Sequence, residues 1–209
     1  LKDLGKLKEA ELSYRKAIEL NPNFANAHSN LGNTLKDLGK LKEAEVSTRK
    51  AIELNSNFAD AHLNLGSILK DLDKLKEAEQ STRKAIELNP NEAKGYSNLG
   101  GILKDLGNLK KAELSVRKAI KLDPNCASAY FSLSTLKYAN ESNLWINKLF
   151  SKNFLNNKNI QDQINIFFAR ANILHNDKKY QESSKCLKLA NKLKLNIKKS
   201  QSEQRINKS

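Results

Sequence analysis

One asparagine recurs at a constant interval along the chain: Asn30, Asn64 and Asn98 each precede a Leu-Gly pair. A side-chain amide offers both a hydrogen-bond donor and an acceptor, which matches the peptide group of an extended chain. Repeated once per unit, these amides form a ladder that could hold a peptide backbone whatever its side chains are. The alternative is that the asparagines only solvate an exposed face, and the residues alone leave that alternative open.

Further polar side chains accompany this ladder and could contact the side chains or acidic groups of a ligand. They are one more amide and four lysines, Asn33, Lys36, Lys70, Lys94 and Lys104. Three of the lysines are each followed by an aspartate, Asp37, Asp71 and Asp105. Alternating charges of this kind suit a charged ligand, but a self-neutralising solvated face is the simpler interpretation.

A long repeat must position these residues. The stretch Leu-Lys-Asp-Leu begins at Leu1, Leu35, Leu69 and Leu103, and the intervals 35−1, 69−35 and 103−69 are each 34. A period of this length is typical of stacked pairs of helices, which offer one extended concave surface. The predicted units are a partial one at 1–24, three full ones at 25–58, 59–92 and 93–126, a degenerate one at 127–163, a similar one at 164–197, and a polar tail or linker at 198–209.

Each unit is expected to contain two helices. In unit 25–58 the apolar residues recur at helical spacing and predict a first helix that Gly39 breaks and a second from about Leu41 to Leu54. Glycines share one column inside the first helices, where each costs about 1 kcal/mol relative to alanine. Close approach of the paired helices is the expected reason. These glycines are Gly32, Gly66 and Gly100.

The columns resemble the tetratricopeptide repeat (TPR) family. In one unit the resemblance is carried by Leu31-Gly32, Leu35, Ala44 and Ala51, followed by a column that holds all three prolines of the chain. It covers residues 1 to about 139. It implies an all-α, right-handed superhelical solenoid of antiparallel helix pairs, which serves as a scaffold and binds an extended peptide or protein segment on its concave face.

Two more specific resemblances bear on the ligand. The array is similar to the repeat region of O-linked N-acetylglucosamine transferases, in which an asparagine ladder lines the groove and binds polypeptide. Ser132 and Ala169 interrupt the ladder here, so the resemblance implies a peptide site within residues 26–105. Repeat arrays that clamp carboxylates of chaperone C-termini match at only three positions, because Ser29 and Asn98 stand where that family has basic residues.

An alternative function comes from the C-terminal part. Residues 167–175, with the Lys/Asn-rich segment before them, look like the junction in bacterial repeat proteins that carry a C-terminal sulfotransferase or glycosyltransferase domain. The chain would then be the substrate-recognition arm of a larger enzyme. It has no Met and opens part-way through a unit, so we expect a fragment of a longer protein.

The chain has a formal charge of +14, and most of the excess lies after residue 126. Lysines interleaved with aromatic residues can bind single-stranded nucleic acid. Here the aromatics fall at helical spacing with leucines, which favours burial. No run of about 18 apolar residues exists that could span a membrane. We therefore expect a protein or peptide partner, and neither nucleic acid nor membrane.

No motif for catalysis or for a cofactor is recognisable, since phosphate-binding loops, nucleophile elbows and Cys/His metal spacings are all lacking. We expect no enzyme activity within these residues, no cofactor and no metal. His28 and His62 share a column with tyrosines and are interpreted as packing residues. Cys126 and Cys186 are interpreted as unpaired thiols in a reducing compartment, which predicts a cytoplasmic protein.

Overall fold

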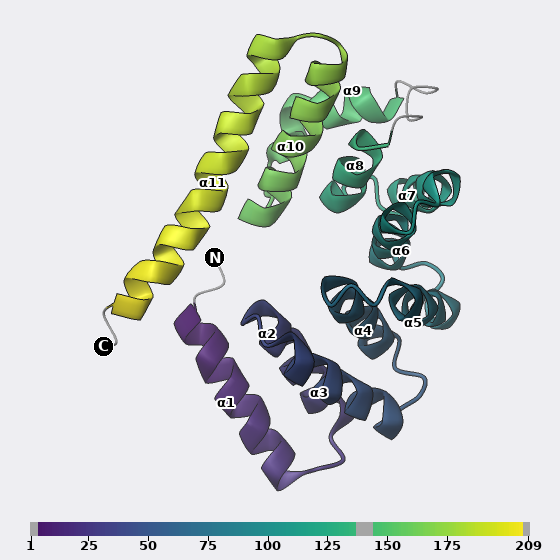
Figure 1. Ribbon diagram of the computed structural model, residues 1–209, viewed down its shortest axis with the longest axis vertical. Helices are drawn as coiled ribbons and strands as arrows, with labels where there is room; N and C mark the ends of the chain where they lie inside the picture. Colours follow the sequence, from purple (N-terminus) through teal and green to yellow (C-terminus); the bar gives the residue numbers. More distant parts are fainter. Residues whose placement is uncertain (1–3, 137–143, 207–209) are drawn as a thin grey trace.

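The computed structural model describes the backbone of residues 4–136 and 144–206, and the side chains of residues 6–136 and 144–196. Within these ranges every regular element is helical (Figure 1), which confirms the predicted all-α solenoid. The elements are α1 (Leu4–Leu20), α2 (Ala25–Asp37), α3 (Leu41–Leu54), α4 (Ala59–Asp71), α5 (Leu75–Leu88), α6 (Ala93–Asp105), α7 (Leu109–Leu122), α8 (Ala127–Ser134), α9 (Leu144–Phe150), a 3₁₀ helix (Lys152–Leu155), α10 (Ile160–Asn176) and α11 (Tyr180–Ile206).

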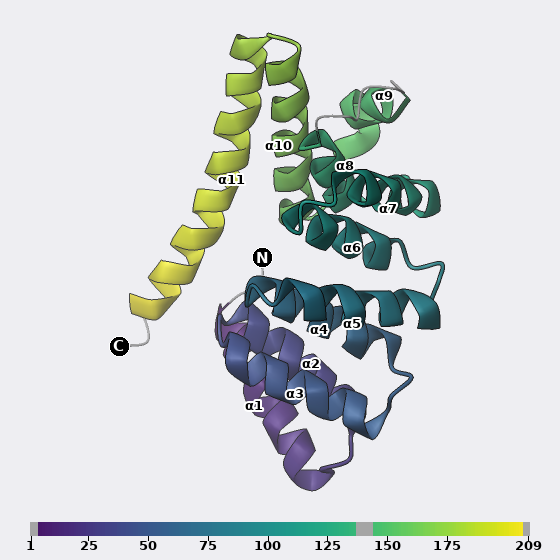
Figure 2. The ribbon, with the colours of Figure 1, turned by 45° about the vertical axis from the view of Figure 1, so that its right-hand side comes forward.

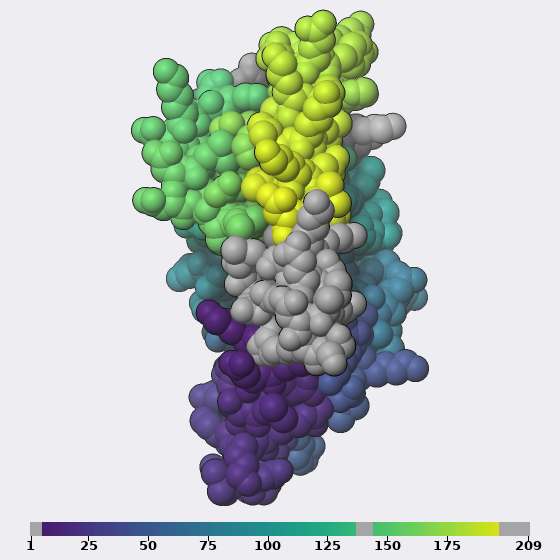
Figure 3. Space-filling model, turned by 90° about the vertical axis from the view of Figure 1, so that its left-hand side faces the viewer, coloured from purple at the N-terminus to yellow at the C-terminus, as the bar shows by residue number. Residues whose placement is uncertain are grey.

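The helices stack as pairs along a curved row. Helix α2 packs on α3, α4 on α5 and α6 on α7, and each pair also contacts the next. The first helices α2, α4, α6 and α8 lie on the inner side of the curve, whereas α3, α5 and α7 lie on the outer side (Figures 1 and 2). Helix α11 runs back from the far end of the row and contacts α1. Figure 3 shows the molecule from this side, with α11 above α1.

A left-handed residue follows each of the helices α2, α4 and α6 at the predicted place. Gly39 and Gly107 have φ of 79°, and Asp73 has φ of 60°. In this conformation the chain closes back on the helix, so that the Lys40 N–H donates to the Leu35 carbonyl at 2.9 Å. The same conformation recurs at Lys178, after α10, with φ of 61°. Helices α10 and α11 therefore repeat the helix-turn-helix arrangement of the earlier pairs.

The glycine column has the predicted cause. A Cβ atom added to Gly32 would overlap Oγ1 of Thr48 in the partner helix and lie 3.1 Å from the Ala44 carbonyl oxygen. Ala44 and Thr48 are fully buried. The paired helices thus touch through their backbones at this column.

The unit predicted at 127–163 departs from the pattern. The helical spacing from Ala127 to Ala139 predicts a first helix over these residues, but α8 ends at Ser134. Residues 137–139 lie outside the described part of the chain. The Ser134 hydroxyl donates to the Phe131 carbonyl at 2.7 Å and competes with the helical hydrogen bonds there. Helix α8 then packs mainly on α10 rather than on α9, and Asn172 Nδ2 donates to Ser134 Oγ at 3.0 Å.

An aromatic cluster fills the space that a regular second helix would occupy. Trp145 and Phe154 are buried against Tyr130 of α8, whereas Phe150 remains 38% exposed. The expected burial of the C-terminal aromatics is therefore confirmed for Trp145 and Phe154 and wrong for Phe150. The same expectation covered Phe167 and Phe168, which are half-buried. Ring packing replaces the small-residue columns that hold the regular pairs together.

The segment predicted as a polar tail or linker, residues 198–209, begins within a helix. Helix α11 continues through residue 198 and ends at Ile206, since no proline or glycine interrupts it. The described helices include none with the length and apolar character that a bilayer crossing requires.

Candidate functional site on the inner face

The inner face is formed by one side of each first helix. In α2, Asn26, Ser29, Asn30 and Asn33 follow one another at i, i+3, i+4 and i+7, a spacing that places them on one side of a helix. Successive first helices adjoin through such residues, because Asn64 Nδ2 donates to Ser29 Oγ at 3.3 Å. A polar strip therefore crosses from one unit to the next.

The three ladder asparagines are not equivalent. Asn30 is exposed, and Asn64 is half-buried with its amide directed to Ser29. Asn98 is also half-buried, but the residue that corresponds to Ser29 in the preceding unit is Leu63, which offers no acceptor. Among the described residues, the side-chain amides of Asn30 and Asn98 make no hydrogen bond. These two amides are wholly available to a ligand, whereas the Asn64 amide keeps one N–H and its oxygen for one.

The lysines of the inner face also divide into two groups. Lys70 pairs with Asp105 of the next unit at 3.3 Å, and Lys36 donates to the Ser67 hydroxyl at 3.1 Å. Lys94 is exposed and Lys104 half-buried, and neither ammonium has a polar partner among the described side chains; the same holds for the half-buried amide of Asn33. Among the described residues, the predicted self-neutralisation thus acts between units at Lys70 and Asp105, and it leaves the ammonium groups of Lys94 and Lys104 on α6 unpaired.

The ladder changes character beyond α6. Ser132 is half-buried on α8, and Ala169 of α10 is fully buried. Between these helices the rings of Phe131 and Phe168 lie with centroids 6.1 Å apart, tilted by 49°. The surface with repeated amides is therefore confined to α2, α4 and α6.

The outer side carries ion pairs of two kinds: the i,i+4 pairs that the sequence spacing predicts, such as Glu11 with Arg15, and pairs across unit boundaries, which that spacing did not reveal. Glu11 is 9% exposed and accepts from Arg15 in its own helix and from Lys40 across the unit boundary, both at 2.9 Å. Arg15 also reaches Glu43 at 2.9 Å. The four positions recur one unit later as Glu45, Arg49, Lys74 and Glu77 with the same pairing. The signal that could have revealed them is the recurrence of opposite charges at sequence separations of 28 and 29.

This network predicts a measurable acid sensitivity. The hydrogen bond from Lys74 and a second from Arg49 hold the pKa of Glu45 below its ordinary value, against the effect of burial. A carboxylate with a depressed folded-state pKa stabilises the fold above its unfolded pKa, and the contribution disappears as the pH falls through the folded value. We expect Glu45→Gln to lose up to about 1 kcal/mol of unfolding free energy at neutral pH and little in acid, measured by urea denaturation from pH 7 to pH 3.

The matched control is Glu79→Gln. Glu79 keeps the pair with Arg83 at 2.8 Å, but Asn108 stands where a lysine would reach it from the next unit. A smaller loss than in Glu45→Gln is expected. Equal losses in the two variants would show that the pair across the unit boundary contributes nothing.

The histidine column holds the turns between units. The Nε2 atoms of His28 and His62 lie 2.9 Å from the carbonyl oxygens of Pro22 and Ser56, and the Tyr130 hydroxyl donates to the Pro124 carbonyl at 3.0 Å. In each case the partner is six residues earlier. His28 and His62 thus contact the backbone of these turns, and their interpretation as packing residues stays a prediction.

Stacked antiparallel helix pairs with a polar inner face define a helical-repeat interaction scaffold. Models of the TPR repeat match residues 1–39, and models described as tetratricopeptide repeat match residues 25–58, 59–92 and 93–126. Together the matches span residues 1–126, more than half of the chain. The chain therefore belongs to the tetratricopeptide repeat family.

Solved structures share the fold. A crystal structure of MamA is 24% identical with a TM-score of 0.56, covering 93% of this chain and 92% of that one. YrrB is 20% identical with a TM-score of 0.56, covering 92% and 97%. The TPR domain of Arabidopsis OM64 is 24% identical with a TM-score of 0.52, covering 54% and 93%. No curated protein matched the chain. Neither a glycosyltransferase nor a sulfotransferase is among these three neighbours, so those resemblances rest on the sequence columns.

Proposed function

We propose that this protein is a non-catalytic scaffold whose inner face binds an extended peptide or protein segment. Asn30, Asn64 and Asn98 hold the backbone of the bound segment. Asn33, Lys36, Lys70, Lys94 and Lys104 contact its side chains, and acidic side chains fit best beside α6.

The observation that carries this proposal is the unused hydrogen-bonding capacity of the inner face. The amides of Asn30 and Asn98 have no partner among the described residues, and the ammonium groups of Lys94 and Lys104 on α6 have none either. A side-chain amide can both donate to and accept from the peptide group of a ligand, whatever side chains the ligand carries. One of the structural neighbours, YrrB, is described as a TPR protein with an unusual peptide-binding site, so the fold itself accommodates this class of ligand.

The test begins with decapeptides selected from a random library against the wild-type chain. Their dissociation constants are then measured by fluorescence anisotropy for the wild type and for the triple variant Asn30→Ala, Asn64→Ala, Asn98→Ala. Each hydrogen-bonded amide contributes about 1 kcal/mol, so the loss of three raises Kd on the order of a hundredfold.

The chain supplies a matched control in Asn23, Asn57 and Asn91, which recur at the same interval as the ladder. They are exposed in the turns before the first helices. The triple alanine variant at these positions is expected to bind like the wild type. Unchanged Kd in the ladder variant, or an equal rise in both triple variants, would reject the inner-face site.

A further inference from the structure

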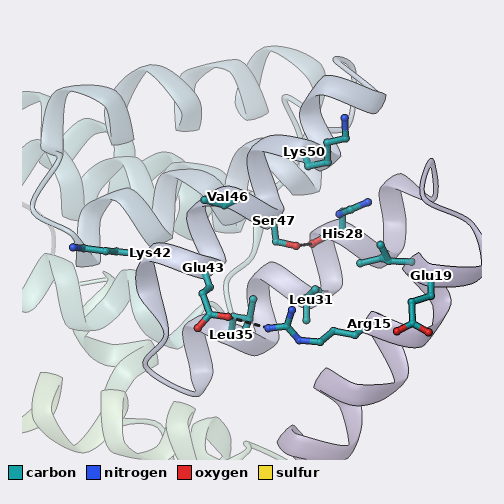
Figure 4. Close-up of a pocket in the computed structure, with 11 residues that line it drawn as sticks. Arg15, Glu19, His28, Leu31, Leu35, Lys42, Glu43, Val46, Ser47 and Lys50 are labelled. Carbon is teal, nitrogen blue, oxygen red and sulfur yellow. Dashed lines mark hydrogen bonds and ion pairs between the residues drawn. The ribbon is translucent and has the colours of Figure 1, made fainter.

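An open pocket lies on the opposite, outer side of the array, between α1 and α3 and above α2 (Figure 4). Its volume is about 690 Å³. Apolar side chains from all three helices line it, and lysines stand at its edge. Its lining includes Ile18, His28, Leu31, Val46, Lys42 and Lys50.

The same pocket recurs one unit later. Between α3 and α5, above α4, a pocket of about 490 Å³ is lined by Ile52, His62 and Leu65, each one repeat period after its counterpart. In both pockets the histidine lies beside the turn whose carbonyl oxygen it approaches at 2.9 Å. Two copies at corresponding positions show that the pocket is a property of the repeat and not of one loop.

The third unit shows what such a pocket accommodates. Tyr96 stands in the histidine column and packs on the same core as Ile86, the counterpart of Ile18 and Ile52. The ammonium of Lys118, which corresponds to Lys50, lies 5.9 Å from the centre of the Tyr96 ring. This chain therefore places an aromatic ring under a lysine in the position where the two earlier units have histidine and an open pocket.

Charge distinguishes the first pocket from the second. Arg15 and Lys50 at its edge are paired with carboxylates, but Lys42 is exposed and has no carboxylate partner among the described residues. Val46 beside it is 71% exposed, whereas the corresponding residue of the second pocket is Gln80. The first pocket is thus more apolar and has an unpaired cation among its lining residues, whereas the corresponding Lys76 does not line the second pocket.

We propose that the two outer pockets bind aromatic side chains of a partner polypeptide, and that the first prefers an aromatic residue with a carboxylate next to it. The ring takes the place that Tyr96 takes in the third unit, and Lys42 pairs with the carboxylate. This second binding surface lies across the helix layer from the amide-lined inner face. It does not depend on the function proposed for that face.

The probe is N-acetyl-tyrosine, which carries a phenol ring and a carboxylate. We expect its titration into the ¹⁵N-labelled chain to shift amide resonances around both pockets, with tighter binding at the first. N-acetyl-tyrosinamide lacks the carboxylate and should bind the first pocket about fivefold more weakly, and the second equally well. Lys42→Gln should remove that difference.

Two substitutions exchange the residues of the histidine column. His28→Tyr should fill the first pocket from within and abolish its shifts while those of the second remain. Tyr96→His should open a third set of shifts around α5 and α7. Both residue types occur in this column, so each variant should fold, which circular dichroism would check. The proposal is overturned if millimolar N-acetyl-tyrosine shifts no outer-face resonance, or if the shifts near α1 and α3 persist in His28→Tyr.

Discussion

Replacing Tyr130 by alanine should destabilise the C-terminal part of the array by about 3–5 kcal/mol, the usual cost of removing a buried aromatic ring. Tyr130 is 1% exposed. Its ring lies edge-on to Phe154 at 4.8 Å and 6.3 Å from Trp145. These contacts hold the segment after α8 in place, where regular helix pairing is lost. Because each unit of a repeat array contacts only its neighbours, the loss should be local.

Two probes separate that local loss from global unfolding. Trp145 is the only tryptophan of the chain, so its fluorescence reports the cluster, whereas far-ultraviolet circular dichroism reports all helices. In urea the fluorescence transition of Tyr130→Ala should come well before the main dichroism transition. An unchanged fluorescence midpoint would contradict the role given to this ring.

Tyr130→Phe is the conservative control. It keeps the ring and removes only the hydroxyl that donates to the Pro124 carbonyl, so a loss of about 1 kcal/mol is expected. Burial raises the pKa of Tyr130 to about 12. Above pH 10 the unfolded chain releases this proton while the folded chain retains it, so the stability of the wild type should fall with rising pH more steeply than that of Tyr130→Phe.

The second large effect separates two adjacent glycines of α6. A Cβ at Gly100 would overlap Cγ2 of the buried Val116 and lie 3.2 Å from the Ala112 carbonyl oxygen. At Gly101 it would meet only the flexible end of Lys70, at 3.3 Å. Alanine gains about 1 kcal/mol of helix propensity at either position, but overpacking costs about 1–3 kcal/mol at the first. Thermal unfolding should therefore show Gly100→Ala destabilised and Gly101→Ala stabilised.

A double variant tests the cause of that difference. Removing the obstructing methyl groups with Val116→Ala should make Gly100→Ala less costly than it is in the wild-type background, so the two substitutions should not be additive. If Gly100→Ala proves as stabilising as Gly101→Ala, the helices are not in backbone contact at this column.

The regular part of the fold could be predicted because each turn or close helix contact requires the same or a similar residue, which then recurs at a fixed interval in the sequence. Gly39 and Gly107 mark the left-handed turns, and Gly32 marks the closest helix contact. Local chemistry of this kind is visible in a single sequence. The predicted second helix, Leu41 to Leu54, matches α3.

The C-terminal part was predictable only in outline. Ser134 stands in the glycine column, and its hydroxyl makes a bond to the backbone that a glycine could not make. The packing of α8 on α10 depends on contacts between residues 38 positions apart, such as Ser134 with Asn172. The unit at 127–163 is three residues longer than the repeat period of 34 and lacks the columns of small residues. Its sequence therefore gives no alignment to the other units from which these contacts could be inferred.

The sequence could predict which residues lie in the candidate site, but not which of their side chains are already hydrogen-bonded within the protein. The sequence places Asn30, Asn64 and Asn98 at one position, yet whether each amide is used depends on the neighbouring unit, which offers Ser29 to Asn64 and Leu63 to Asn98. The outer pockets were missed because they are spaces between units. The only sign of these pockets in the sequence was the change from His62 to Tyr96 at the same position of successive units.

The most direct test of the inner-face site is to follow the side-chain amide resonances of Asn64 and Asn98 while a selected decapeptide is titrated into the ¹⁵N-labelled chain. Both resonances should shift as the peptide binds, and the Asn98 amide, which has no partner in the described structure, should shift most. The inner-face site would be contradicted if the peptide saturates the chain while both side-chain amide resonances stay unshifted, and only the resonances of residues around Val46 and Gln80 on the outer side shift.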